Sequence, residues 1–292
     1  MDGPGTSRLL ADLDLARRLE WTEARSNIEF VEARAQISPE LGAEWIEVAG
    51  AAVMYDGPAS PCTQTFGLGM RAELGESDLE QIETFFRQRG APVYHEVSPL
   101  ADIAVHQLLS RRGYQPVEMT SVMFLDLASE GRGRPAEPQG REAGMAQQTA
   151  EMPPVEVRVV GDEEWPAWAR LAAEGWSELT EYADLMFELA LVSASRRGAI
   201  SFLAEVAGQG VATAGLSLVD DVALLTGAST IPSARRQGAQ RALLRSRLDF
   251  AARAGGRVAM ICALPGSASQ RNAEREGFRI AYTRIKWGLS GE

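Results

Sequence analysis

Two periodic patterns of hydrophobic and polar residues occur in the C-terminal half of the chain, and each pattern predicts one kind of secondary structure. Alternation of apolar and polar positions predicts strands over 155–160, 201–206, 211–219, 222–229, 258–263 and 280–287. Apolar residues at helical spacing predict helices over 162–174, 182–194, 238–254 and 267–275, the first with Asp162 as its N-cap. Short turns join the three strands between 201 and 229, which predicts an antiparallel meander. The order indicates an α/β (α+β) fold whose mixed, mostly antiparallel sheet is flanked by helices.

The end of the N-terminal half repeats part of this order. Helices are predicted over 77–89 and 102–111, and strands over 92–97 and 117–127. The segment SRRGYQPVEMTSVMF at 110–124 resembles EREGFRIAYTRIKW at 274–287, about 164 residues later. Both contain a helix end, a glycine suited to a left-handed C-cap, an aromatic residue and an alternating strand. Two related domains explain this match, but so does a common way of leaving a helix, and the sequence leaves both explanations open.

A stretch between the two halves has the composition of a linker. Residues 128–154 are rich in Gly, Pro, Glu and Gln and hold almost nothing that could pack in a core. We therefore expect one domain at 1–127, a flexible linker at 128–154 and a second domain at 155–292. The first domain has 20 acidic and 10 basic residues and the second has 16 of each, so the net charge of −11 belongs almost wholly to the first.

Composition excludes several classes of protein. No apolar run approaches the roughly 18 residues that span a bilayer, and the polar N-terminus does not resemble a signal peptide, so a cytoplasmic protein without a membrane partner is expected. Cys62 and Cys262 have no cysteine neighbour at ligand spacing, which argues against a bound metal. An acidic chain also argues against nucleic acid as a partner, because phosphate binding needs a basic face.

The predicted helix at 238–254 begins in the manner of an anion site. Gly238 permits close backbone approach, the helix start offers unpaired N–H groups, and five arginines lie nearby without an acidic residue between Asp221 and Asp249. These are Arg235, Arg236, Arg241, Arg245 and Arg247. The pattern favours a pyrophosphate site, although an ordinary glycine loop before a solvated helix gives the same letters. In the N-terminal half, Ser77 and Glu80 instead predict a capping box whose carboxylates occupy the place of an anion.

At these residues the sequence resembles the GCN5-related N-acetyltransferase (GNAT) superfamily. The resemblance rests on Pro232, Arg235 and Gly238, with Gln240 where the family usually has Gly or Ala, and on SQRNAEREGF further on. It implies two GNAT-like domains in tandem, the N-terminal one degenerate and without a phosphate loop. It also implies acetyl-CoA as the acyl donor, bound by residues at the end of one strand, at the start of the next helix and on a later helix. Those residues are Ser229, Thr230 and Ile231 for the pantetheine arm, Arg235, Arg236, Gln237, Gly238, Ala239, Gln240 and Arg241 for the pyrophosphate, and Asn272 as a polar contact.

The side chains that would catalyse such a transfer are hard to find in the sequence. The acid of the family is often a tyrosine, but Ala273 stands at that position, and the strand at 222–229 has no carboxylate. Glu178, Glu181 and Tyr282 are the candidate replacements, and each is more often a surface or strand residue than a catalyst. His95 and His106 have no partner at ligand spacing and are expected to be structural.

The expected function is therefore N-acyl transfer from acetyl-CoA to an amine by direct attack on the thioester. The acceptor would be a small molecule or a peptide, and the acidic N-terminal domain indicates a cationic amine or only a soluble surface. The alternative is a non-catalytic acyl-CoA-binding sensor, which the missing tyrosine and carboxylate favour. Acyl-chain preference and the choice between monomer and homodimer stay open.

Overall fold

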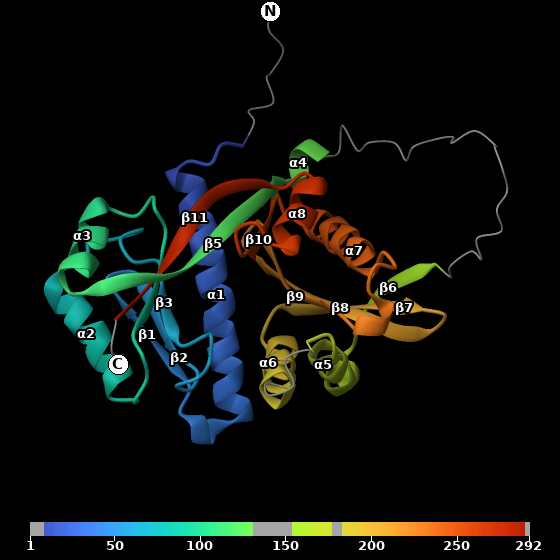
Figure 1. The fold of residues 1–292 in the computed structure, drawn as a ribbon, viewed down its shortest axis with the longest axis horizontal. Helices are drawn as coiled ribbons and strands as arrows, with labels where there is room; N and C mark the ends of the chain where they lie inside the picture. The colour runs from blue at the N-terminus through green and yellow to red at the C-terminus, as the bar shows by residue number, and fades with distance from the viewer. Residues whose placement is uncertain (1–8, 131–153, 177–182, 290–292) are drawn as a thin grey trace, which may run out of the picture.

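One mixed sheet runs through the part of the chain that the computed structural model describes, which is residues 9–130, 154–176 and 183–289 (Figure 1). Its described strands follow the order β1-β2-β3-β4-β11-β5-β10-β9-β8-β7-β6. The strands are β1 (Glu44–Val48), β2 (Ala51–Tyr55), β3 (Gln64–Phe66), β4 (Tyr94–Val97), β5 (Tyr114–Asp126), β6 (Val155–Val159), β7 (Ala199–Val206), β8 (Gln209–Val219), β9 (Val222–Thr230), β10 (Val258–Ala263) and β11 (Arg279–Leu289). Neighbours pair parallel in β3–β4 and β9–β10 and antiparallel elsewhere in this part of the chain, as the sequence predicts.

Helices cover both faces of this sheet. They are α1 (Leu13–Ile37), α2 (Glu76–Arg87), α3 (Ile103–Arg111), α4 (Leu127–Glu130), α5 (Trp165–Glu174), α6 (Ala183–Ser195), α7 (Ala239–Arg253) and α8 (Ala268–Arg275), with short 3-10 helices at Pro39–Leu41, Asp162–Glu164 and Pro232–Ala234. Along β7, Phe202 packs in the same core as Leu243 of α7, whereas Leu203 packs with Trp168 of α5. Because neighbouring strand residues point to opposite faces, α7 and α5 lie on opposite sides of the sheet.

Two predicted helix starts are wrong in detail. A 3-10 turn begins at Asp162, and the N-cap is Gly161, whose N–H donates to the Glu164 carboxylate at 3.1 Å. Helix α2 begins at Glu76, and the N–H of Gly75 donates to the Asp78 carboxylate at 2.9 Å, so the predicted Ser77 and Glu80 box does not form. In both cases a carboxylate three residues after a glycine binds the glycine amide, and no capping hydroxyl or carboxylate is needed at the N-cap itself.

The two halves exchange their last strands. Strand β11 lies between β4 and β5, both from the N-terminal half, while β5 lies between β11 and β10 of the C-terminal half. In the β5–β11 pair, Thr120 stands opposite Arg284, which is the residue 164 positions later in the repeat. A residue that pairs with its own counterpart marks an approximate two-fold axis, so the register favours two related domains over the other explanation that the sequence leaves open.

Helix α1 lies where the halves meet and contacts both of them (Figure 1). Leu15 and Leu19 share a core with Val222 and Leu224 of β9. Farther along α1, the main-chain carbonyl of Ser26 accepts a hydrogen bond from Arg196, which follows α6, at 3.1 Å. The predicted linker lies mostly outside the described residues, and the domain boundaries at 127 and 155 stay a prediction.

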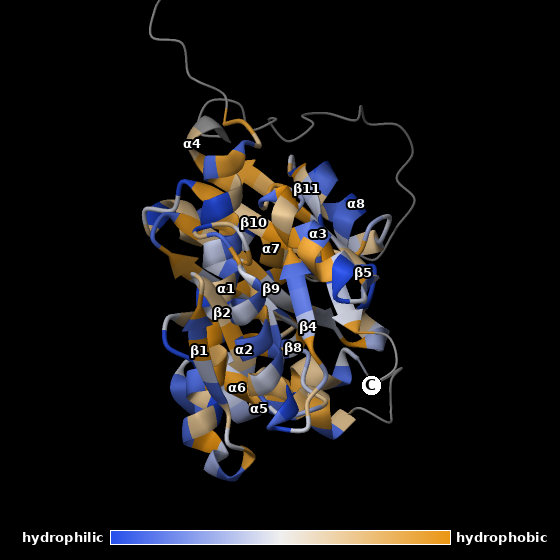
Figure 2. Ribbon diagram, turned by 90° about the vertical axis from the view of Figure 1, so that its left-hand side faces the viewer, coloured by the Kyte–Doolittle hydropathy of each residue, from blue (hydrophilic) through white to orange (hydrophobic). Residues whose placement is uncertain are grey.

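The hydrophobic residues concentrate on the strands and on the helix faces turned toward them, while α8 is largely hydrophilic (Figure 2). Among the described helices, none combines the length and the apolar composition needed to cross a membrane.

Candidate functional site

Strands β9 and β10 separate soon after they begin. Their parallel pairing joins only Val258–Met260 to Val222–Leu224. Beyond that point β9 continues beside β8, with Thr230 opposite Ala212, and β10 continues beside β5. The later residues of β9 therefore have no pairing with β10. Open sheets bind ligands at such a place, beyond the carboxyl ends of diverging parallel strands.

A bulge in β9 lies beside this divergence. Thr226 pairs with Gly215 and Ser229 pairs with Thr213, so Gly227 and Ala228 together stand opposite Ala214. Gly227 has a left-handed backbone with φ 58°, which favours glycine. Both bulge residues are exposed. The bulge thus leaves backbone polar groups outside the β8–β9 hydrogen-bond ladder, next to the β9–β10 divergence.

Buried Arg247 holds this bulge from the α7 side. Its Nη1 donates to the carbonyls of Gly215 at 3.2 Å and Thr226 at 3.4 Å, which lie opposite each other on β8 and β9. Burial lowers the pKa of Arg247 to about 10, so the guanidinium stays charged at neutral pH. Arg247 is therefore a structural residue of the site and is not available to a phosphate.

The start of α7 is open. Gly238 is its N-cap with φ 86°, and no side chain caps the helix. A Cβ added at Gly238 would meet no atom within 4 Å. The amides of Ala239, Gln240 and Arg241 lie in the first turn, where they have no intrahelical acceptor. Together with the positive end of the helix dipole, these groups form a site suited to an anion.

Side chains around Gly238 connect this helix start to β9. The Gln240 amide donates to the Thr230 hydroxyl at 2.7 Å, so Gln240 ties α7 to the strand end and does not face outward as a free donor. Arg235 donates to the carbonyl of Gly175 at 3.1 Å and to that of Thr230 at 3.4 Å. Gln237 donates to the Ser233 carbonyl at 3.1 Å. Arg236 is exposed with φ 66°.

The five arginines that the sequence gathers are not equivalent in the structure. Glu276, in the turn after α8, pairs with Arg241 at 2.7 Å and with Arg245 at 3.3 Å. This carboxylate lies 35 residues beyond Arg241 in the chain, and no local pattern indicated it. The positive charge beside Gly238 is consequently smaller than the composition of the segment suggests.

The last residues of β9 pack tightly against the end of α5. The hydroxyl of Ser229 contacts that of Thr213 at 3.0 Å and donates to the Ala172 carbonyl at 3.1 Å. A Cβ added at Gly175 would lie 2.6 Å from the Ser229 side chain. Ser229 and Thr230 therefore use their side chains within the protein, and the Thr230 carbonyl accepts from Arg235. Gly175 is a site residue that sequence reasoning missed.

Of the three candidate catalytic side chains, the structure describes Tyr282. Glu178 and Glu181 lie outside the described residues. Tyr282 is buried on β11, where its hydroxyl donates to Glu20 at 2.8 Å, and burial followed by the charge of Glu20 raises its pKa well above the usual range. Asn272 is exposed on α8 and accepts from Arg275 at 3.0 Å. The geometry favours a structural role for Tyr282, and the roles of all four residues stay predictions.

Known proteins resemble this chain in part of its sequence and in its fold. Residues 160–278 match the sequence model of the Acetyltransferase (GNAT) family, and none of the curated proteins compared with the chain matches it. A GCN5-related N-acetyltransferase from Kribbella flavida has a similar structure, with a TM-score of 0.59 and 18% identity over 91% of this chain and 96% of that one. A tandem GNAT protein from the clavulanic acid biosynthesis pathway also gives 0.59, with 12% identity over 97% and 98%.

Proposed function

We propose that this chain is an N-acyltransferase, on the premise that residues 160–278 are a GNAT acetyltransferase domain. The acyl donor is acetyl-CoA or a related acyl-CoA, and the acceptor is an amine. The proposal is supported chiefly by two structural features that lie next to each other. The β9–β10 pairing ends after three residue pairs, and the uncapped start of α7 follows the open part of β9.

The residues present fit such a donor. The first-turn amides of α7 hold the phosphates, because a helix start without a side-chain cap lacks acceptors. The Thr230 backbone, which faces away from β8, is left for the extended arm in place of β10. The predicted Ile231 is not available to the arm, because its amide donates to the Val211 carbonyl at 3.1 Å and its carbonyl accepts from Ala234 at 3.0 Å. Ser229 faces β8 through its pairing with Thr213.

When bound, the donor supplies a thioester carbonyl that an amine attacks. The bulge at Gly227 and Ala228 offers backbone N–H groups that stabilise negative charge on its oxygen.

The described part of the N-terminal half does not offer an equivalent site. The corresponding helix start is closed by Asp78, whose carboxylate accepts from Gly75. In the loop before it, a Cβ on Gly69 would lie 2.4 Å from Val105 of α3, whereas one on Gly238 would meet nothing within 4 Å. An anion at α2 would face the Asp78 and Glu76 carboxylates. We therefore place the single donor site in the C-terminal half.

Release of free thiol from acetyl-CoA over a panel of amines tests the proposal. Gly238→Glu places a carboxylate at the helix start, and we expect it to lower kcat/KM at least about tenfold, because the repulsion exceeds about 1.4 kcal/mol. Gly255→Glu is the matched control. Gly255 also has a positive φ, 91°, and open space around its Cβ, but it follows the other end of α7. Equal loss in both variants, or no thiol release with any amine, would contradict the proposal.

A non-catalytic acyl-CoA sensor is the second candidate. Ala273, at the position where the resemblance implies a tyrosine, is fully buried and has no group that could protonate a thiolate. A sensor binds acetyl-CoA and releases no thiol with any amine. A transferase without this tyrosine still gains rate from positioning, which supplies several kcal/mol.

A further inference from the structure

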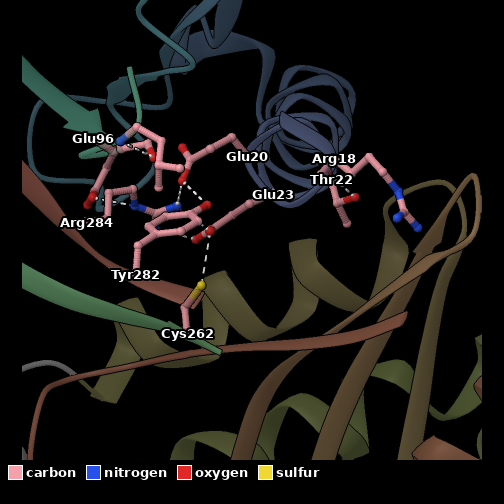
Figure 3. Close-up of polar contacts among 10 residues, drawn as sticks. Arg18, Glu20, Thr22, Glu23, Glu96, Cys262, Tyr282 and Arg284 are labelled. Carbon is pink, nitrogen blue, oxygen red and sulfur yellow. Dashed lines mark hydrogen bonds and ion pairs between the residues drawn. The ribbon is translucent and has the colours of Figure 1, made fainter. Parts of the chain in front are cut away.

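A cluster of buried charges lies between α1 and the exchanged strands (Figure 3). Arg284 of β11 is at its centre and contacts three carboxylates. Its distances are 2.6 Å and 3.0 Å to the two oxygens of Glu23, 2.9 Å to Glu96 and 3.3 Å to Glu20. Lys286 lies 3.7 Å from Glu96. Two of these carboxylates come from α1, one from β4 and both cations from β11, so the cluster depends on the strand exchange.

The cluster holds more negative charge than positive charge. Three carboxylates face the two cations Arg284 and Lys286, and the buried Oε2 of Glu20 has no hydrogen-bond partner among the described residues. Burial raises the pKa of Glu20 to about 6. For Glu23 burial is the largest single influence and opposes ionisation, but the charge of Arg284 together with the hydrogen bonds from Arg284 and Cys262 and the charge of Lys286 lowers the pKa. Glu23 therefore stays ionised at neutral pH, and one further positive charge would balance the cluster.

Glu23 is the member of this cluster that reaches the β9–β10 divergence. Its Oε2 accepts a hydrogen bond from the Cys262 thiol at 3.1 Å (Figure 3). Cys262 is the second residue of β10 after Met260, where the pairing with β9 ends. The Glu23 side chain is 15% exposed, against 2% for Glu20. A thiol is a weak donor, and an ammonium group that replaced it would make a stronger, charge-assisted bond.

At the β9–β10 divergence, the two faces of the sheet are covered by different helices. Leu224 and Met260 belong to the core beneath α1, and Cys262 packs against it. Leu225 and Ala259 belong to the core beneath α7. Because α7 covers one face and its start is assigned to the phosphates, we place the approach of the acceptor on the other face. That is the face on which α1 presents Glu23.

We propose that Glu23, supplied by the first helix of the N-terminal half, binds the ammonium group of the acceptor, so that both halves build one active site for a cationic amine. The proposal rests on the acyl transfer proposed above. Glu23 acts here as a binding residue and not as the base, because its pairing with Arg284 leaves it a poor proton acceptor.

The test compares two amines in the full-length enzyme with acetyl-CoA as donor. Butylamine is charged at neutral pH and aniline is not. We expect Glu23→Gln to raise KM for butylamine about tenfold or more, a change of about 1.4 kcal/mol, since it removes a charge-assisted hydrogen bond. KM for aniline and the Kd of acetyl-CoA should stay within about twofold of wild type, a change below 0.5 kcal/mol. Glu29→Gln is the matched control, because it removes the same charge from the same helix and breaks a local pair with Arg25.

The outcomes separate the two proposals. If acetyl-CoA fails to bind, or neither amine releases thiol, the proposed function fails. If both amines react and Glu23→Gln changes their KM values equally or not at all, only the role of Glu23 fails. Should Glu23→Gln not fold, the wild-type enzyme decides: raising the salt concentration should increase KM for butylamine and leave that for aniline unchanged, because salt screens a partly exposed ion pair. The same KM response for both amines would overturn the role.

Discussion

His95 shows how a single residue of this protein departs from its usual chemistry. It is fully buried on β4, and its ring lies 4.8 Å from the Tyr114 ring between centroids, with the two planes tilted by 51°. Neither ring nitrogen has a partner among the described residues. Burial lowers its pKa to about 3, so the folded protein keeps the ring neutral. The sequence predicted a structural role because no ligand spacing was present, and the packing is consistent with that role.

His95 should make the fold sensitive to mild acid. The unfolded chain protonates this histidine below about pH 6.5, whereas the folded chain does not, so the free energy of unfolding falls as pH decreases from about 6.5 toward 3. At pH 5 the loss is about 2 kcal/mol. We expect His95→Phe to keep the ring contact with Tyr114 and to remove this loss, so that its stability relative to wild type increases by about that amount between pH 7.5 and pH 5.

Urea unfolding at the two pH values measures this difference. His106→Phe is the control, because His106 is half-buried and its ring contacts the Ser98 carbonyl at 3.3 Å. A pH response that is the same for both variants would show that burial of His95 is not the cause.

At the scale of elements, the local sequence pattern was sufficient to predict those strands and helices whose bounds are set by neighbouring residues. The strands of the meander and helix α7 follow from alternation and from Gly238, and both lie within a residue or two of their predicted bounds. Helix α1 was not predicted. It buries polar residues such as Glu20, Thr22, Ser26 and Arg34, because both halves of the molecule pack around it, and this blurs its amphipathic pattern. The contact between Tyr282 and Glu20 joins residues 262 positions apart, so a local sequence pattern cannot predict it.

The contact between α5 and β9 gives a prediction at this scale. Gly175 has an ordinary φ of −61°, so Gly175→Ala introduces no backbone strain and adds only a methyl group 2.6 Å from Ser229. We expect it to push β9 outward, to lower the free energy of unfolding by about 1–3 kcal/mol and to weaken acetyl-CoA binding. The double variant Gly175→Ala/Ser229→Gly removes the colliding side chain and should recover part of both losses. Additive losses in a double-mutant cycle would contradict this packing account.

For the whole molecule, the exchange of β5 and β11 makes the halves depend on each other. Without residues 1–127, β11 loses both neighbouring strands and β10 loses β5. We expect the fragments 1–127 and 155–292 to lack cooperative unfolding when each is made alone, and to recover it when they are refolded together. Thermal melts followed by circular dichroism measure this. A cooperative transition of 155–292 alone would show that β11 can pair within its own half.

The central claim is that one half of a symmetric pair binds a phosphate-bearing acyl donor and that the other half cannot. Titration calorimetry of the full chain with acetyl-CoA tests it most directly. We predict one site per chain, lost in Gly238→Glu and kept in both Gly255→Glu and Gly90→Glu, the latter a glycine with φ 61° and open space just after α2. Two equivalent sites, no binding, or binding that survives Gly238→Glu would contradict the account.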